Sequence, residues 1–253
     1  MTGPLLSLTG VSRSFRRGRH ELRVLADVSL HVSAGEIVAV QGQRGAGKTT
    51  LLKIAAGMEP SDGGRVSFDG WDLTEVSDVQ LSRLLGEQIG WVQNSGPESR
   101  VRVLDYVALP LLISLGDRAA YTRAEQALDR VGAAECTHQR WETLSDGERG
   151  LVGIAHAIVR SPRLLLIDDV TTILGIRELD TLGHLLRSIA GESAIGVLMT
   201  VSELTAANCA DRRMTLAGGR LLGPPSELLP EMPDRPDEGK GDVIDLSSRE
   251  RLA

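Results

Sequence analysis

The chain has 253 residues, of which 42% are hydrophobic, 25% charged and 3% aromatic, and these are ordinary values for a globular protein. Its 28 basic and 34 acidic side chains give a net charge of −6, which argues against a nucleic-acid partner bound through bulk positive charge. Two cysteines, Cys136 and Cys209, are too few for a disulfide framework, so we expect two reduced, buried thiols. We expect no signal peptide and no membrane span, which predicts a cytoplasmic chain.

The first forty residues are predicted to form strands. Residues 22–25 and 28–32 partly alternate apolar and polar side chains, and residues 33–35 mark a turn. Residues 37–40 are a short continuous apolar run, which is typical of a buried parallel strand. Further elements expected in this part are a helix that ends at Gly57 and short strands at Arg65–Phe68 and Ile89–Val92.

Residues 95–160 have a different pattern and are predicted to form an inserted helical subdomain. Residues 103–115 are apolar and of helical character, with a proline inside. The capping-box spacing at Thr122–Glu125 predicts a helix that opens there and runs to Val131. The same spacing at Ser145–Glu148 predicts the start of another helix, because an apolar run of helical period comes after it.

The alternation of strands and helices is predicted to resume after residue 160. Residues 164–167 predict a buried strand that leads into two aspartates, and residues 179–189 predict a helix that stops at Gly191. A buried strand at 194–201 and a hairpin around Gly218–Gly219 complete a domain that we expect to span residues 1–225. Residues 226–253 are rich in charge and poor in apolar side chains, and they are predicted to form a disordered acidic tail.

The segment Gly42–Thr49 fits the phosphate-loop pattern G-x-x-x-x-G-K-[ST]. Glycines let the backbone curl so that N–H groups point at phosphate oxygens, and the next helix adds its positive N-terminal end. Lys48 is expected to bind the β- and γ-phosphates of a nucleotide, and Thr49 is expected to coordinate Mg²⁺. The predicted nucleotide-binding residues of this loop are Gly42, Gln43, Arg44, Gly45, Ala46, Gly47, Lys48, Thr49 and Thr50.

The segment Leu164–Asp168 has the Walker B pattern, an apolar strand that ends in an aspartate. A carboxylate at the end of a central strand can reach Mg²⁺ through water, since Mg²⁺ prefers carboxylate oxygens and retains water ligands. Alone the pattern is weak, because any buried strand that ends in aspartate matches it. Downstream of a phosphate loop it predicts Asp168 as a further Mg²⁺ residue.

A third segment, Leu144–Glu148, reads L-S-D-G-E. Together with Gly42–Thr49 and Leu164–Asp169 it makes the chain resemble the ATP-binding cassette (ABC) ATPase family, whose signature is LSGGQ or LSGGE. The resemblance extends from about residue 5 to residue 222, in the family's order and spacing. The chain is most similar to the branch that serves lipoprotein release and macrolide export, on the segments Glu21–Leu25, Asp27–Leu30, Gly35–Glu36, Asp69–Gly70 and Ala108–Leu111.

The resemblance implies an α/β fold, namely a P-loop NTPase core of the RecA type with an antiparallel β-subdomain and the inserted α-helical subdomain. Two cassettes are then expected to dimerise head to tail, so that Ser145 and Gly147 of one face the ATP held by the other. Phe15 falls where the family stacks an aromatic ring on adenine, although a core-facing aromatic is the alternative. Gln93 corresponds to the glutamine that senses Mg²⁺ and faces the membrane partner, if one residue is deleted from the family's I-G-Y-V-F-Q.

Several positions depart from the family pattern. Asp169 stands where the family has the catalytic glutamate that polarises the attacking water, and it is one methylene shorter. A carboxylate retracted by about 1 Å can cost roughly a hundredfold in rate. Ser202 stands where the family has the switch histidine, Gly175 replaces an aspartate, and Asp146 replaces a glycine of the signature. Asp169, Ser202 and Gln93 are the expected catalytic positions, and hydrolysis at this site is expected to be slow.

The sequence therefore predicts the ATP-binding subunit of an ABC transporter, which binds ATP and Mg²⁺ and drives a separate integral-membrane permease from the cytoplasmic face. A second, competent ABC ATPase subunit is the expected partner, and a homodimer with slow turnover is the alternative. The second hypothesis is a pseudo-ATPase that binds ATP only as a regulatory clamp on a membrane complex. An ABC ATPase of DNA repair or translation is disfavoured, because the chain has one cassette and no heptads.

Overall fold

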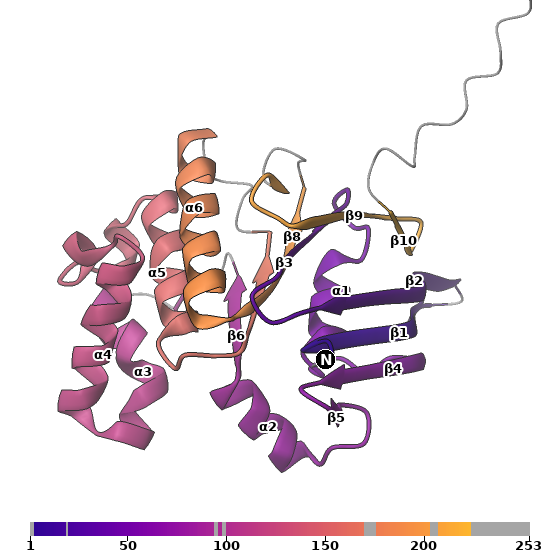
Figure 1. Cartoon of the computed structure of the whole chain (residues 1–253), viewed down its shortest axis with the longest axis horizontal. Coiled ribbons are helices and arrows are strands. Elements are labelled where there is room, and N and C mark those ends of the chain that lie inside the picture. The colour runs from indigo at the N-terminus through magenta and orange to yellow at the C-terminus, as the bar shows by residue number, and fades with distance from the viewer. Residues whose placement is uncertain are drawn as a thin grey trace, which may run out of the picture.

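Two β-sheets organise the chain in the computed structural model, which describes residues 3–18, 20–93, 96–97, 100–169, 176–202 and 207–223 (Figure 1). The strands are β1 (Leu6–Arg17), β2 (His20–Val32), β3 (Ile37–Gln41), β4 (Gly63–Phe68), β5 (Trp71–Asp72), β6 (Ile89–Gln93), β7 (Leu164–Asp168), β8 (Gly196–Val201), β9 (Arg212–Ala217) and β10 (Arg220–Leu222). The helices are α1 (Lys48–Ala55), α2 (Asp78–Glu87), α3 (Val103–Leu115), α4 (Asp117–Arg130), α5 (Asp146–Ile158) and α6 (Ile176–Ser193), with short 3₁₀ turns η1 (Ala134–Cys136) and η2 (Trp141–Thr143).

The larger sheet has six strands in the order β10-β9-β3-β8-β7-β6, and it is parallel from β9 to β6. Its buried strands send alternate side chains to opposite faces, because successive residues of a strand point to opposite sides. Ile37 and Ala39 of β3 join the core that packs under α3, α4, α5 and α6. Val38 and Val40 join a second core with α1 and the antiparallel sheet β2-β1-β4-β5. Figure 1 shows these layers on either side of the large sheet.

The carboxyl ends of the parallel strands bring the predicted site residues to one edge of the large sheet. Gln93, Asp168 and Thr200 are register partners at the ends of β6, β7 and β8. Gly42 comes directly after β3, and Ser202 comes directly after β8, the neighbour of β3. Ligands bind outside this edge in open α/β sheets, so the topology places the motifs where chemistry is expected.

The helix predicted to open at Thr122 begins earlier, at Asp117, so the capping-box prediction there is wrong. The Thr122 hydroxyl donates instead to the Arg118 carbonyl within the helix. The earlier start buries Ala120 completely between the inserted helices, and that packing outweighs the local capping signal.

Two further helices differ from the sequence prediction. The predicted stop at Gly191 is wrong, because α6 runs on to Ser193. A glycine inside a helix costs about 1 kcal/mol, which the burial of Leu186 and Ile189 on the same helix offsets. The apolar pattern also does not predict α2, although Ser77 and Gln80 form both hydrogen bonds of a capping box at its start.

Other expectations are confirmed in the part of the chain that the structure describes. Gly218 and Gly219 have positive φ angles of 55° and 77° in the hairpin between β9 and β10. Cys136 and Cys209 are buried free thiols, and burial raises the pKa of Cys136 to about 11. No helix in the described ranges has the length and apolar character to cross a membrane. The predicted tail and Gly175 lie outside the described residues.

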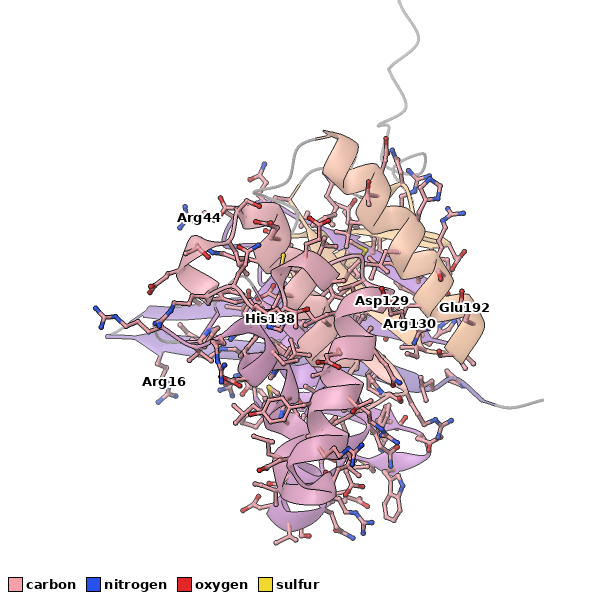
Figure 2. The ribbon with its side chains drawn as sticks, turned by 90° about the vertical axis from the view of Figure 1, so that its left-hand side faces the viewer. Arg16, Arg44, Asp129, Arg130, His138 and Glu192 are labelled. Atoms are coloured by element: carbon pink, nitrogen blue, oxygen red, sulfur yellow. The ribbon has the colours of Figure 1, made fainter. Side chains whose placement is uncertain are left out.

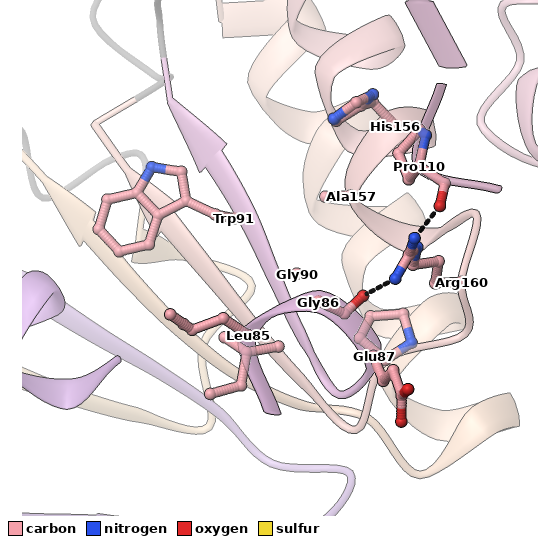
Figure 3. Close-up of a pocket in the computed structure, with 11 residues that line it drawn as sticks. Leu85, Gly86, Glu87, Gly90, Trp91, Pro110, His156, Ala157 and Arg160 are labelled. Carbon is pink, nitrogen blue, oxygen red and sulfur yellow. Dashed lines mark hydrogen bonds between the residues drawn. The ribbon is translucent and has the colours of Figure 1, made fainter. Parts of the chain in front are cut away.

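His156 on α5 and Arg160, two residues beyond the end of α5, bond to carbonyl groups of α3 and α2, and Figure 3 shows them beside a cavity of about 310 Å³. Pro110 lies inside α3 and has no N–H to donate to the Tyr106 carbonyl one turn earlier. His156 Nδ1 lies 2.9 Å from that carbonyl oxygen and must be the donor, because a carbonyl only accepts. Arg160 donates to the carbonyls of Pro110 and Gly86. We call His156 and Arg160 the α5 clamp.

The α5 clamp predicts an interaction between Pro110 and His156. We expect His156→Phe to keep the stacking on Tyr106 but to lose the donor, which lowers the Tm by about 2–4 °C. Pro110→Ala gives α3 its own N–H for the Tyr106 carbonyl. We therefore expect His156→Phe to cost clearly less in the Pro110→Ala background, as thermal unfolding of the four proteins would measure. Equal costs in both backgrounds would contradict this account.

Candidate functional site

The loop between β3 and α1 has the curled shape that its glycines allow. Gly47 adopts φ 103° at the start of α1, and a Cβ there would lie 2.7 Å from Cγ1 of Val24 on β2. A Cβ on Gly42 would lie 2.9 Å from the Leu216 carbonyl oxygen. Both positions therefore require glycine, one for its backbone angle and both for the close approach of neighbouring strands. The next helix begins at Lys48, so its free N–H groups point into this loop.

Lys48 lies inside the loop, and only 7% of its side chain is exposed. Its ammonium group donates to the Gly42 carbonyl at 2.6 Å and to the Ser202 hydroxyl at 3.0 Å. It also lies 3.4 Å from Oδ2 of Asp169. A buried cation at a helix N-terminus, enclosed by backbone, is suited to a multiply charged anion such as a triphosphate.

Asp169 and Ser202 lie together beside Lys48, although 33 residues separate them in the chain. The Ser202 hydroxyl donates to Oδ2 of Asp169 at 2.5 Å. Asp169 has a positive φ of 47°, a conformation that aspartate tolerates better than most residues. The Asp169 carboxylate therefore contacts both the Ser202 hydroxyl and the Lys48 ammonium.

Thr49 and Asp168 form a second polar pair at the sheet edge. The Thr49 hydroxyl donates to Oδ2 of Asp168 at 2.8 Å, and the buried Thr200 hydroxyl donates to Oδ1 at 3.0 Å. Adjacent oxygen ligands of an octahedral Mg²⁺ lie about 2.9 Å apart, given metal–oxygen distances of 2.0–2.1 Å. The Thr49 and Asp168 oxygens therefore have a separation that fits neighbouring positions around one Mg²⁺ ion.

A groove of about 730 Å³ opens above these groups. Trp91 donates to the side-chain carbonyl of Gln93 at 3.1 Å, and Gln93 lines the groove from β6. Arg44 lines it too and extends to the edge of the molecule (Figure 2). The lining residues are Phe15, Val24, Gln43, Arg44, Gly45, Gly47, Lys48, Thr49, Thr50, Gln93, Asp168 and Asp169. The groove thus unites a predicted base-binding ring, the phosphate loop and both aspartates.

The signature residues Ser145 and Gly147 lie elsewhere, at the N-terminal end of α5, and they are not among the described residues that line the groove. The predicted capping box is confirmed there, since Glu148 N–H donates to the Ser145 hydroxyl and Ser145 N–H donates to the Glu148 carboxylate. That Ser145 N–H lowers the pKa of Glu148. The positive end of α5 is thus formed and open, away from the chain's own phosphate loop.

Three residues at the site have no prediction from the sequence. Thr200 orients Asp168 through a hydrogen bond. The sequence feature that could have indicated this role is the hydroxyl side chain within the apolar run of β8. Val24 lines the groove because β2 passes close to Gly47. Arg13 lies over the Phe15 ring. Its guanidinium bonds to Glu59 and Asp62, which are 46 and 49 residues away in the chain, so no local pattern indicates these contacts.

A parallel sheet whose buried strand leads into a glycine-rich loop, with a lysine at the first turn of the next helix, defines a P-loop NTPase. The dimeric structure of a bacterial ABC transporter cassette matches this fold with a TM-score of 0.79 at 24% sequence identity, over 85% of this chain and 96% of that chain. The ABC transporter family model matches residues 25–172. The chain belongs to the ABC transporter family.

Two relatives illustrate the range of the family around this chain. The lipoprotein-releasing system ATP-binding protein LolD of Chromohalobacter salexigens is 36% identical over 222 residues, which cover 86% of this chain and 92% of that protein. The macrolide export ATP-binding/permease protein MacB of an Azoarcus species is 32% identical over 237 residues. Those residues are 91% of this chain but 35% of that protein, so the chain spans about a third of that relative.

Proposed function

We propose that the chain is the ATP-binding subunit of an ABC transporter, and that it drives a separate integral-membrane permease from the cytoplasmic face. The observation that carries the proposal is the groove itself, where Lys48 is buried in the phosphate loop and Thr49 and Asp168 lie 2.8 Å apart. The similarity to LolD and MacB, both named as ATP-binding proteins, supports it. The names of relatives include lipoprotein release, macrolide export and methionine import, so the proposal assigns no cargo.

In this proposal the loop residues 42–50 hold the phosphates, and Lys48 neutralises the β- and γ-phosphates. Thr49 and Asp168 would hold Mg²⁺, whose charge would help to neutralise the phosphoryl group that is transferred. Phe15 stacks on adenine at the other end of the groove, and Gln93 contributes its amide beside the aspartates. Residues 1–225 form the ATP-binding domain, with the helical subdomain at about 95–160.

Hydrolysis at this site is proposed to be slow. Asp169 is short, and its Oδ2 already accepts the Ser202 hydroxyl and faces the Lys48 ammonium. A general base must reach within hydrogen-bond distance of the attacking water, and the retracted carboxylate reaches less far than a glutamate. The chain is therefore proposed to pair head to tail with a second, competent ABC ATPase subunit, and its signature Ser145–Glu148 then serves the partner's ATP. A homodimer with slow turnover is the alternative arrangement.

Calorimetric titration with MgATP tests the proposed function. Wild type is expected to bind, and Lys48→Ala is expected to bind at least about tenfold more weakly, because a buried charge-assisted contact to phosphate is lost. Lys53→Ala is the matched control, since Lys53 is an exposed lysine on the same helix. If Lys48→Ala binds MgATP as tightly as wild type and Lys53→Ala, the assignment of the phosphate loop is wrong.

A further inference from the structure

Arg13 lies against the Phe15 ring, with its guanidinium carbon 4.7 Å from the ring centroid. Two carboxylates hold that guanidinium: Asp62 accepts a hydrogen bond of 2.8 Å from Nη1, and Glu59 accepts one from Nη2. The other Asp62 oxygen accepts the Ser14 N–H at 2.6 Å. Only 18% of the Arg13 side chain is exposed. The guanidinium is therefore fixed in position and orientation, since two donors and one ring face are engaged.

Phe15 has two different surroundings. It is 37% exposed and lines the same groove as the phosphate loop. Arg13 is not among the described residues that line that groove. Arg13 therefore contacts the ring without lining the groove itself, and Phe15 still presents exposed ring surface to the groove.

The contacts of Arg13 also connect β1 to the segment that follows α1. Glu59 and Asp62 lie just after α1 in the chain, the helix whose first residue is Lys48. Backbone pairing supports the same junction, because the Asp62 N–H donates to the Ser12 carbonyl at 2.8 Å. A displacement of β1 at Phe15 would therefore disturb the ion pairs of Arg13 with Glu59 and Asp62, in the segment that follows α1.

We propose that Arg13 is a positioning residue for the nucleotide base, which rests on the proposed function as an ATP-binding subunit. Arg13 backs the Phe15 ring and holds it at a set distance from the phosphate loop, so that adenine stacks on a platform that is already ordered. Preordering lowers the entropy lost on binding, and base–aromatic stacking is worth roughly fivefold in affinity or more. Arg13 itself is not a catalytic residue, because it acts through Phe15.

A comparison of two ligands separates this role from a general structural one. The full chain is titrated calorimetrically with MgATP, which carries a base, and with magnesium tripolyphosphate, which carries none. We expect Arg13→Met to weaken MgATP binding by about three- to tenfold and to leave tripolyphosphate binding unchanged. Arg16→Met is the matched control, since Arg16 is an exposed arginine on the same strand that points away from the body of the molecule (Figure 2). It measures the effect of losing one positive charge.

A double-mutant cycle with Phe15→Leu completes the test. Phe15→Leu is expected to show the same selective loss of MgATP affinity, and adding Arg13→Met to it is expected to cause little further loss. If Arg13→Met does not fold, the pair Glu59→Gln and Asp62→Asn releases the guanidinium with Arg13 still present, and the same selective loss is expected. Equal weakening of both ligands beyond the Arg16→Met effect, or unchanged MgATP binding, would overturn the role of Arg13. Failure of wild type to bind either ligand would instead refute the proposed function, and the role of Arg13 with it.

Discussion

Replacing Ser145 by arginine is expected to abolish ATP hydrolysis in the assembled transporter, although Ser145 lies outside the groove of its own chain. The end of α5 is already formed, with both capping-box hydrogen bonds in place. In the proposed head-to-tail dimer, its positive end stabilises the γ-phosphate of the partner's ATP only when the two cassettes close. An arginine at this position fills the gap and prevents closure. Phosphate release by the purified complex of this chain, its cassette partner and the permease measures the effect.

Two further variants control that experiment. Ser77→Arg removes the equivalent capping box of α2 and is expected to leave hydrolysis near wild type, which separates closure from the loss of a helix cap. Asp169→Asn is expected to do far less harm than Ser145→Arg, because this chain's own site is proposed to contribute little turnover. If Asp169→Asn stops turnover and Ser145→Arg leaves it intact, the proposed division of labour is reversed. Loss of turnover in both variants would also contradict the proposed division of labour, because this chain's own site would then be needed as well as its signature.

The double variant Asp169→Glu, Ser202→His is expected to raise ATP turnover of the isolated chain by about a hundredfold. In the structure Oδ2 of Asp169 accepts the Ser202 hydroxyl at 2.5 Å and lies 3.4 Å from Nζ of Lys48. Removing the hydroxyl takes one hydrogen bond away from the carboxylate, and the extra methylene extends the carboxylate toward the attacking water. The imidazole replaces the serine hydroxyl at the position of the family's switch histidine. The steady-state rate of phosphate release at saturating MgATP measures the gain.

The single variants show whether the two groups act as a unit. Each is expected to gain much less than the double variant, because a longer carboxylate still bonds to Ser202 and an imidazole alone leaves the base too short. Rapid hydrolysis by the purified wild-type chain would contradict the proposal of a slow site. A gain from Asp169→Glu that equals that of the double variant would show that Ser202 does not limit turnover.

The phosphate loop is predictable from the sequence because its geometry is local. Glycine angles, a lysine and a threonine within eight residues determine where the N–H groups, the ammonium and the hydroxyl lie. The position of Asp168 is predictable for a related reason, since parallel strands end at a common edge. The partners of these residues are not local. Thr200 and Ser202 meet the aspartates only through the register of β7 and β8.

The sequence predicts some helix starts correctly and others wrongly. The capping boxes at Ser77 and Ser145 both form, whereas Thr122 lies inside a helix. The earlier start of α4 goes with the complete burial of Ala120, whereas α5 begins directly after its Ser145 cap. A local cap decides the boundary only where tertiary packing does not compete with it.

The α5 clamp also constrains the order in which this chain can change over evolution. Pro110 creates the need for a donor at the Tyr106 carbonyl, and His156 supplies it. A lineage that first replaces Pro110 restores the helical N–H and is then free to lose His156. A lineage that first loses His156 must survive with a carbonyl left without its donor, which costs about 1–3 kcal/mol when the group is buried. Substitutions at these two positions are therefore expected to be epistatic. Replacement of Pro110 before His156 is expected to be tolerated, and the reverse order is expected to be selected against.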